Sequence, residues 1–307
     1  MLHVAYEDVA RAGRNTSRLL PPTPIDAVKK NLMLKLENAN VGHSFKIRGA
    51  LNAIIEYGGP LVAASTGNFG NAIAIAGQIL DTEVVVVVPK NITPEKLDRI
   101  RSHHVEVIVS GGTFGGAERF AHELAIARSI RFVSPYNDPA VIAGGGVIGL
   151  EIAEQITTGA RIYVPTGGGG LVSGIAIALA GEQRFEVIAS CPEQSTAFMF
   201  AVLERGIGVP GPSIADGLIG EIEDDCLTVT TARNYGVQFE LASEAEIESA
   251  CVALLRLGWL AEPAAAVGVA VSERMRQHDL LPHVCILTGS NIDYRIVKTL
   301  VAGSELK

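Results

Sequence analysis

Runs of basic residues and long apolar stretches are missing from this chain of 307 residues. Its 25 Lys and Arg residues are outnumbered by 33 Asp and Glu residues, which gives a net charge of −8 at pH 7. This balance excludes the basic patch with which proteins bind nucleic acid or acidic membrane surfaces. The longest apolar stretches are strand-length or broken by glycine, and the charged N-terminus is no signal peptide. We therefore expect a cytoplasmic protein with no nucleic-acid or membrane partner.

Cysteine is also sparse, with 4 residues at Cys191, Cys226, Cys251 and Cys285. These cysteines form no C-x-x-C pair and match no zinc-binding spacing. The sequence thus predicts reduced, mostly buried thiols and no metal site. Aromatic residues make up only 5% of the chain, so the core must be built mainly from Ala, Val, Ile and Leu.

What the chain does contain is an alternation of apolar β-branched runs with Ala-rich helical runs. The predicted strands are 83–89, 105–110, 161–165, 185–190 and 283–288, and the predicted helices are 72–80, 94–102, 117–128, 171–180 and 244–257. Nearly continuous apolar strands are typical of parallel sheets that are covered on both faces. The pattern predicts an α/β protein with open, mostly parallel sheets and helices on both faces.

The same alternation favours two lobes. We predict a small, mobile domain at residues 60–136, inserted into a larger domain made of residues 1–59 and 137–307. Ligands of such sheets bind at the carboxyl ends of the strands. The glycine-rich segments that follow the strands are therefore the candidate site.

The first candidate segment is His43-Ser44-Phe45-Lys46-Ile47-Arg48-Gly49-Ala50. Ser44 has the chemistry of an N-cap, and the spacing to Tyr57 predicts a helix with Lys46 in its first turn. The positive end of the helix dipole and partial burial between Phe45 and Ile47 both disfavour the charged amine. An amine with a lowered pKa is what Schiff-base chemistry requires.

Two further segments have the composition of anion sites. Ser65-Thr66-Gly67-Asn68-Phe69-Gly70-Asn71 enters a helical run, and Thr166-Gly167-Gly168-Gly169-Gly170 links a strand to a helix that begins near Leu171. Helix starts leave backbone N–H groups free to bind a carboxylate or a phosphate. Four consecutive glycines are costly in chain entropy, so the backbone is expected to wrap closely around a ligand. The tetraglycine loop is neither a Walker A loop nor a dinucleotide-binding turn.

Weaker signals lie elsewhere. Thr288, in Leu287-Thr288-Gly289-Ser290-Asn291, follows a strand, where its hydroxyl is able to bond a heterocyclic nitrogen, and Glu262 precedes a proline. The runs 111–116 and 144–146 are glycine-rich and predict loops or helix-start turns.

Together these segments resemble the fold type II pyridoxal-phosphate enzymes, in particular the group of serine/threonine dehydratases and serine racemases. The resemblance extends from Pro22-Thr23-Pro24 to Asn291-Ile292-Asp293. It implies a two-lobed fold like that of the tryptophan synthase β subunit, with pyridoxal 5'-phosphate in the large domain. It also implies an amino acid substrate and a homodimer.

The resemblance assigns roles to cofactor-binding residues. Lys46 is similar to the Schiff-base lysine and general base, and Phe45 to the residue beside the ring. Asn68 corresponds to the residue that holds the 3-oxygen, and Thr288 to the one that faces the pyridine nitrogen. The phosphate cradle corresponds to Gly167, Gly168, Gly169, Gly170 and Leu171.

Substrate-binding roles follow in the same way. Ser65, Thr66, Gly67 and Asn68 correspond to the loop that binds the substrate carboxylate, and Glu262 to a glutamate near the substrate edge. The chain departs from the family at Phe69, where histidine is usual. It also departs at Met199, which stands where racemase-like members have an aspartate ligand, so no divalent cation is expected.

The expected activity is removal of water and ammonia from a β-hydroxy amino acid such as L-threonine or L-serine, which leaves a 2-oxo acid. Racemisation stays open because Thr66 carries a hydroxyl where racemases have serine. β-Replacement and a binding protein without turnover on the same scaffold also stay open.

Overall fold

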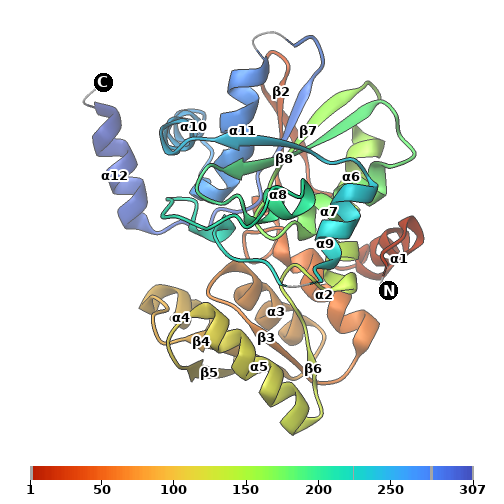
Figure 1. Cartoon of the computed structure of the whole chain (residues 1–307), viewed down its shortest axis with the longest axis vertical. Coiled ribbons are helices and arrows are strands. Elements are labelled where there is room, and N and C mark those ends of the chain that lie inside the picture. The colour runs from red at the N-terminus through yellow and green to blue at the C-terminus, as the bar shows by residue number, and fades with distance from the viewer. Residues whose placement is uncertain (1–2, 224, 277–278, 306–307) are drawn as a thin grey trace.

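The computed structural model describes residues 3–223, 225–276 and 279–305 (Figure 1). Within these residues, six strands form one sheet in the order β1-β2-β10-β7-β8-β9 and four form another in the order β5-β4-β3-β6. Only the pair β1–β2 among the described pairs is antiparallel. The prediction of open, mostly parallel sheets in an α/β protein is confirmed.

The large sheet consists of β1 (Ile25–Lys29), β2 (Leu32–Lys35), β7 (Ala160–Pro165), β8 (Phe185–Pro192), β9 (Gln238–Ala242) and β10 (His283–Ile286). One of its faces packs on α10 (Glu244–Arg256) and α11 (Pro263–Met275). The other packs on α6 (Pro139–Gln155), α7 (Gly170–Leu179), α8 (Ala197–Val202) and α9 (Leu227–Asn234). Helix α1 (Tyr6–Thr16) lies on the outer side of α6 and α7.

The small sheet consists of β3 (Leu61–Ala64), β4 (Val84–Pro89), β5 (Glu106–Ser110) and β6 (Arg131–Phe132). Alternate residues of β3 and β4 face opposite sides, as the period of a strand requires. One side packs on α2 (Lys46–Tyr57), α3 (Asn68–Ile79) and α4 (Pro94–Arg101), and the other on α5 (Phe114–Arg128).

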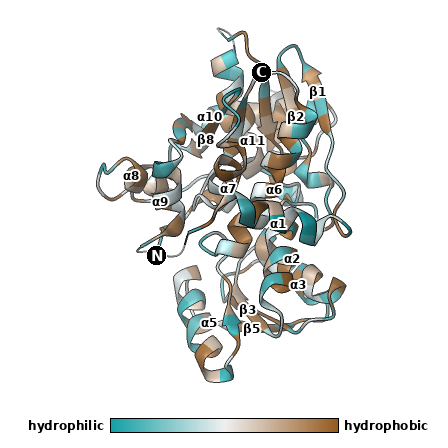
Figure 2. Ribbon diagram, turned by 90° about the vertical axis from the view of Figure 1, so that its right-hand side faces the viewer, coloured by the Kyte–Doolittle hydropathy of each residue, from teal (hydrophilic) through white to brown (hydrophobic). Residues whose placement is uncertain are grey.

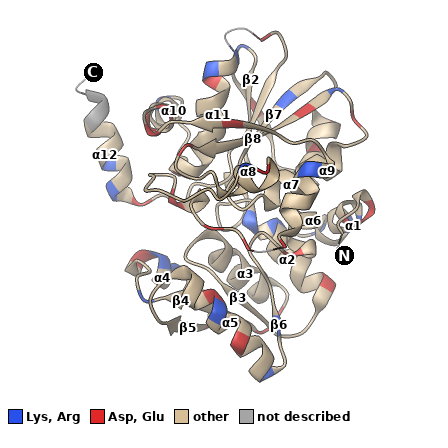
Figure 3. Ribbon diagram, in the orientation of Figure 1, with Lys and Arg blue, Asp and Glu red and all other residues tan. Residues whose placement is uncertain are grey.

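Charge and hydropathy follow this layering. The ribbons of α7 and α11 are largely hydrophobic in Figure 2. Figure 3 shows charged residues on the outer helices α1, α4 and α5 and none on α7. Among the described helices, none is both long and apolar enough to span a bilayer. All four cysteines are buried and free.

One local prediction is wrong. The glycines Gly144, Gly145 and Gly146 lie inside α6 and not in a loop or helix-start turn. A Cβ at Gly144 would come within 2.6 Å of the Arg48 carbonyl oxygen, and one at Gly146 within 2.7 Å of the Gly174 carbonyl oxygen. These glycines are needed because α6 approaches the backbones of α2 and α7 closely on two sides, a tertiary demand that local sequence does not reveal.

The connecting 3₁₀ turns η1 (Glu37–Ala39) and η2 (Asp216–Leu218) and the final helix α12 (Tyr294–Glu305) complete the described elements. The parallel strands β10 and β7 have their carboxyl ends at the same edge of the large sheet, and the backbone before α2 bonds Thr288 at the end of β10. This arrangement brings the predicted site segments toward one another.

Candidate active site

Lys46 is the first residue of α2, and the backbone before it is attached to the end of β10. The Phe45 N–H donates to the Thr288 carbonyl oxygen at 2.9 Å, and Ser44 forms an antiparallel bridge with Gly289. The N-cap of α2 is Phe45, without a side-chain cap, so the expectation that Ser44 caps the helix is wrong. Ser44 instead extends the sheet, which places Lys46 at the carboxyl edge of the strands.

The Lys46 amine lies in a partly buried, mostly apolar environment. Its Nζ donates to the Pro135 carbonyl oxygen at 2.8 Å and lies 5.0 Å from the centroid of the Phe45 ring. The Phe69 ring is 5.8 Å away, so two aromatic faces border the amine. Burial lowers the pKa of Lys46 to about 8, although the Glu262 carboxylate opposes this effect. Such an amine is available as a nucleophile or a base near neutral pH.

The tetraglycine loop is packed so closely that side chains are excluded from it. Gly169 has φ +85°, a left-handed conformation that favours glycine. A Cβ at Gly168 would lie 2.5 Å from the Tyr136 ring, and one at Gly170 would lie 2.7 Å from the Tyr136 carbonyl oxygen. A Cβ at Gly167 would come within 2.9 Å of the Leu218 carbonyl oxygen. Neighbouring backbone and rings therefore hold the loop in one shape.

The loop leads directly into α7, whose N-terminus has the features of an anion site. The first i,i+4 bond that closes on the loop runs from the Ser173 N–H to the Gly169 carbonyl oxygen at 3.0 Å. Earlier N–H groups of the helix start have no carbonyl partner within the helix and are free to bind a phosphate. The hydroxyl of Thr228, on α9, donates to the Gly168 carbonyl oxygen at 2.7 Å and so helps to hold the loop in place. Leu171 is buried in the first turn of α7.

A single segment connects the Lys46 amine with the glycine loop. The Pro135 carbonyl accepts the bond from Lys46, and the next residue, Tyr136, packs against Gly168 and Gly170. Consecutive Cα atoms are about 3.8 Å apart, so the amine and the loop contact neighbouring residues of one segment. The chemistry that the sequence predicts needs this proximity, because one ligand must reach both.

Asn68, Glu262 and Asn291 form a hydrogen-bonded chain beside the amine. The Asn68 Nδ2 donates to both Glu262 oxygens, at 2.7 and 3.0 Å, and the Asn291 Nδ2 donates to the Asn68 Oδ1 at 2.8 Å. Burial raises the pKa of Glu262 to about 7, while the bond from Asn68 lowers it. The predicted residues Asn68 and Glu262 are thus in contact, although 194 residues separate them in sequence.

The segment before α3 has a different arrangement from the one its sequence suggests. The Ser65 Oγ accepts bonds from the Gly67 N–H at 3.2 Å and the Gly70 N–H at 2.8 Å. The hydroxyl of Ser65 therefore stabilises the start of α3, and its own proton is left to donate. Thr66 and Gly67 are partly exposed, and a Cβ at Gly67 would meet open space. Phe69, which stands where the related family usually has histidine, is buried.

Thr288 follows β10 and is buried. Its carbonyl oxygen accepts a bond from the Phe45 N–H, so Thr288 lies beside the residue that precedes α2. The structure brings Phe45, Lys46, Thr288, Asn68 and Glu262 into one contiguous cluster through the contacts described above.

Sequence reasoning missed the segment Ser134–Asp138 and its partner Glu223. The Ser134 Oγ and Asn137 Nδ2 donate to the two Glu223 oxygens at 3.0 and 2.8 Å, and the Glu223 N–H donates to the Tyr136 hydroxyl at 3.0 Å. These bonds hold Tyr136 over the glycine loop. An aromatic residue within a Pro/Asn/Asp turn between two predicted elements was the available signal.

Comparison with known proteins adds independent information. A family model described as pyridoxal-phosphate dependent enzyme matches residues 12–289. The chain is 32% identical to L-threonine ammonia-lyase of Thermotoga maritima, over 97% of this chain and 78% of that protein. It is 29% identical to the catabolic L-threonine dehydratase TdcB of Staphylococcus aureus, over 97% of this chain and 92% of that protein. Serine racemase of Dictyostelium discoideum superposes with a TM-score of 0.84 at 28% identity, covering 94% of this chain and 99% of that chain.

Proposed function

Since the chain belongs to the pyridoxal-phosphate dependent enzymes, we propose that it is an ammonia-lyase that acts on a small β-hydroxy amino acid. Water and ammonia are removed from a substrate such as L-threonine or L-serine, and a 2-oxo acid remains. The observation that carries the proposal is the partly buried amine of Lys46, joined through Pro135 and Tyr136 to a side-chain-free anion loop. The names of the threonine ammonia-lyase and dehydratase relatives support the reaction class.

The residues present fit pyridoxal 5'-phosphate. The loop Gly167–Gly170 and the start of α7 would hold the phosphate, because the loop has no room for side chains and the helix N-terminus favours an anion. Lys46 would hold the aldehyde carbon, and Phe45 would lie beside the ring. Asn68 would bind the 3-oxygen, and the buried Thr288 would face the ring nitrogen. When bound, this cofactor supplies a ring that withdraws electrons from the substrate α-carbon.

The protein's own side chains then move the α-proton of the substrate and bind its carboxylate. The amine of Lys46, with its pKa lowered by burial to about 8, takes the proton from the α-carbon as a general base. The loop Ser65-Thr66-Gly67 binds the substrate carboxylate, and the Ser65 hydroxyl, which accepts bonds from the Gly67 and Gly70 N–H groups, holds the loop in shape. The neutral Thr288 hydroxyl would face the ring nitrogen without placing a positive charge beside it. Glu262 orients Asn68 through two hydrogen bonds.

Racemisation is the second candidate because Thr66 offers a hydroxyl close to Ser65 and Gly67 at the start of α3. A racemase needs an acid on the face opposite the base, and a threonine hydroxyl is able to serve as one. The likeness to serine racemase of Dictyostelium discoideum supports keeping this candidate.

The test is an assay of purified protein, loaded with pyridoxal 5'-phosphate, against a panel of β-hydroxy amino acids. We expect release of ammonia and a 2-oxo acid, without accumulation of the D-amino acid. The Lys46→Ala variant is expected to lose the visible absorption of the bound cofactor and at least a thousandfold in kcat. The exposed Lys90→Ala variant is the matched control and should behave as wild type. D-Serine without pyruvate would establish a racemase, and a colourless wild-type protein would refute both enzymatic candidates.

We also propose a cytoplasmic homodimer, a large cofactor-binding domain of residues 1–59 and 137–307, and a small mobile domain of residues 60–136. The reduced, buried cysteines support a reducing compartment. The separate four-stranded sheet, formed entirely by strands between residues 61 and 132, supports the domain division.

A further inference from the structure

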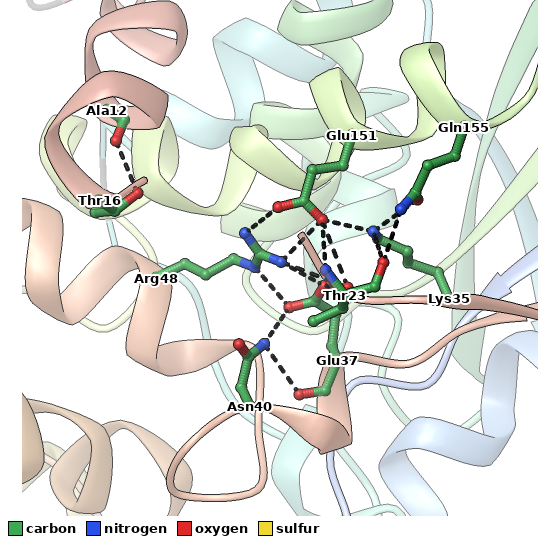
Figure 4. Close-up of polar contacts among 9 residues, drawn as sticks. All are labelled: Ala12, Thr16, Thr23, Lys35, Glu37, Asn40, Arg48, Glu151 and Gln155. Carbon is green, nitrogen blue, oxygen red and sulfur yellow. Dashed lines mark hydrogen bonds and ion pairs between the residues drawn. The ribbon is translucent and has the colours of Figure 1, made fainter. Parts of the chain in front are cut away.

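A buried cluster of charged residues surrounds Arg48, two positions after Lys46 on α2 (Figure 4). Arg48 is 1% exposed, Lys35 and Glu37 are 0% exposed, and Glu151 is 6% exposed. The four residues come from β2, η1, α2 and α6, so the cluster joins the large sheet to the helix that carries Lys46. The proposed reaction makes no direct use of these groups.

Arg48 is at the centre of the cluster and binds both carboxylates with paired hydrogen bonds. Its Nε and Nη2 donate to the Glu37 oxygens at 2.7 and 2.9 Å. Its Nη1 and Nη2 donate to the Glu151 oxygens at 2.6 and 3.0 Å. Burial opposes the charge of Arg48, but the two carboxylates outweigh this effect and raise its pKa above the ordinary value. A planar guanidinium held by two bidentate contacts has little freedom to rotate or translate.

The rest of the cluster balances the charge and holds the carboxylates. Lys35 Nζ donates to Glu151 at 2.5 Å and to the Thr23 carbonyl oxygen at 2.7 Å. The Thr23 hydroxyl and the Asn40 amide donate to Glu37 at 2.6 and 2.8 Å. Two cations face two anions, so the cluster carries no net charge.

Stability alone does not require such a cluster. A protein in which apolar residues of similar volume replace a buried ion pair is often no less stable, because the desolvation of the ions offsets their attraction. What a cluster of paired charges adds is a defined geometry, since each contact is directional and an unpaired partner is costly. The question is therefore which part of the molecule needs a defined geometry here.

Helix α2 needs a defined geometry at its first turn. The helix starts without a side-chain cap, at Phe45. Its contact with α6 is a close backbone approach, in which a Cβ at Gly49 would lie 2.9 Å from the Val141 carbonyl oxygen. A close backbone approach of this kind fixes the distance between α2 and α6. Because it contains no directional side-chain bond, it restricts the sliding and rotation of α2 less. Arg48 supplies directional contacts in the same turn.

Lys46 and Arg48 are two positions apart, so their side chains leave the helix about 200° apart at 3.6 residues per turn. Arg48 points toward Glu37 and Glu151, and Lys46 points toward Pro135 on the other side. A rotation of the first turn that moves one of these side chains must move the other in the opposite direction.

We propose that Arg48, held by Glu37 and Glu151, is a positioning residue that fixes the first turn of α2 and thereby the direction in which the Lys46 amine meets the cofactor. The inference rests on the proposed role of Lys46 as the cofactor-binding lysine.

The test compares Arg48→Lys and the double variant Arg48→Met with Glu37→Gln against wild type. The first keeps the charge but loses the paired contacts, and the second removes one charge of each sign and leaves Lys35 paired with Glu151. Arg161→Met is the matched control, because Arg161 also bonds two carboxylates, Glu186 and Asp279, at the opposite end of the sheet. Circular dichroism and urea denaturation identify conditions under which each protein is fully folded.

The first readout needs no substrate. Pyridoxal 5'-phosphate is added, sodium borohydride fixes it to the lysine with which it has reacted, and peptide mass spectrometry measures the labelled Lys46 over time. We expect labelling at least fivefold slower in both Arg48 variants and unchanged in Arg161→Met. The second readout is turnover, where kcat should fall at least tenfold while KM stays within twofold. The pH midpoint of the cofactor's visible absorption should shift in the Arg48 variants alone.

Wild-type rates of labelling and an unchanged pH midpoint in a folded double variant would overturn the inference. If neither Arg48 variant folds, Asn40→Ala is the deciding variant, since it removes the two bonds of the Asn40 amide to Glu37, one to the carboxylate and one to the backbone carbonyl, and leaves all four charges paired. That variant is expected to slow labelling two- to threefold, and no change would overturn the inference. Wild-type protein that is labelled at Lys46 but releases no 2-oxo acid would refute the proposed lyase activity alone.

Discussion

Substitution of Gly169 by alanine tests the glycine loop at the position where the structure is most demanding. Gly169 has φ +85°, and an added Cβ would overlap the ring of Phe198, which is 1% exposed and cannot move into solvent. Two independent costs follow. An L-residue in the left-handed region costs roughly 1–2 kcal/mol, and forcing an extra methyl group into a packed core costs typically about 1–3 kcal/mol.

The sum predicts a loss of about 2–5 kcal/mol in the free energy of unfolding. Unfolding entropy near 60 °C is about 2.1 cal/mol/K per residue, so over 307 residues a loss of about 3 kcal/mol lowers the melting temperature by roughly 5 °C. Gly181→Ala is the control, because Gly181 is exposed, has no positive φ and has open space around its Cβ position. It should change stability by no more than about 0.5 kcal/mol.

A binding assay distinguishes a specific effect on the phosphate site from a general loss of stability. If the loop and the start of α7 hold the phosphate, Gly169→Ala should weaken binding of pyridoxal 5'-phosphate but leave binding of unphosphorylated pyridoxal nearly unchanged. Loss of one hydrogen bond to a charged group is worth about 1.5–3 kcal/mol, or roughly 10–100-fold in Kd. Absorbance titrations of both compounds at a temperature where the variant is folded give this ratio. Equal losses for both compounds, or a variant as stable as wild type, would contradict the account of the loop.

Two further predictions concern titration and capping. In the folded protein the pKa of Glu262 is about 7, above the ordinary 4.5. As pH rises from 4.5 to 7, this carboxyl loses its proton in the unfolded chain before it does so in the folded protein, so the free energy of unfolding falls over this range. Glu262→Gln should therefore be more stable than wild type at pH 8, by up to about 3 kcal/mol, and equal to it at pH 4, in urea denaturation at both pH values. Asp138 accepts bonds from two N–H groups of α6 and from the Tyr57 hydroxyl. Asp138→Ala should lower the free energy of unfolding by about 2 kcal/mol, and Tyr57→Phe, which keeps the cap, by about 1 kcal/mol.

The sheets were predictable because central strands such as Val84–Pro89 and His283–Ile286 are buried along their whole length. Expected strand 161–165 is observed as Ala160–Pro165, and expected helix 94–102 as Pro94–Arg101. In each case the local composition and the tertiary environment favour the same structure. Short or edge elements such as Arg131–Phe132 and Gln238–Ala242 were not expected, since two to five residues with partly exposed side chains leave little periodic signal.

The residues of the site were predictable by type, but several of their contacts were not. Glycines and a lysine after strands indicate a ligand, and the structure places Lys46 against Pro135 and Gly168 against the adjacent Tyr136. The pairing of Asn68 with Glu262 depends on how two distant segments meet, which no local pattern encodes. The expectation that Ser44 caps α2 fails because Phe45 is the N-cap, while Ser44 precedes it and bridges Gly289.

The reactivity of Lys46 depends on burial more than on the helix dipole. A helix N-terminus disfavours a nearby cation by only about 0.3–1 kcal/mol, whereas lowering the pKa from 10.5 to about 8 corresponds to roughly 3 kcal/mol. Glu262 opposes this shift, so burial outweighs both other influences. The amine is therefore kept available by the rings of Phe45 and Phe69 and by the packing that excludes water around them. Phe69 belongs to α3 and Phe45 precedes α2, so residues of both helix starts contribute to the burial that lowers the pKa of Lys46.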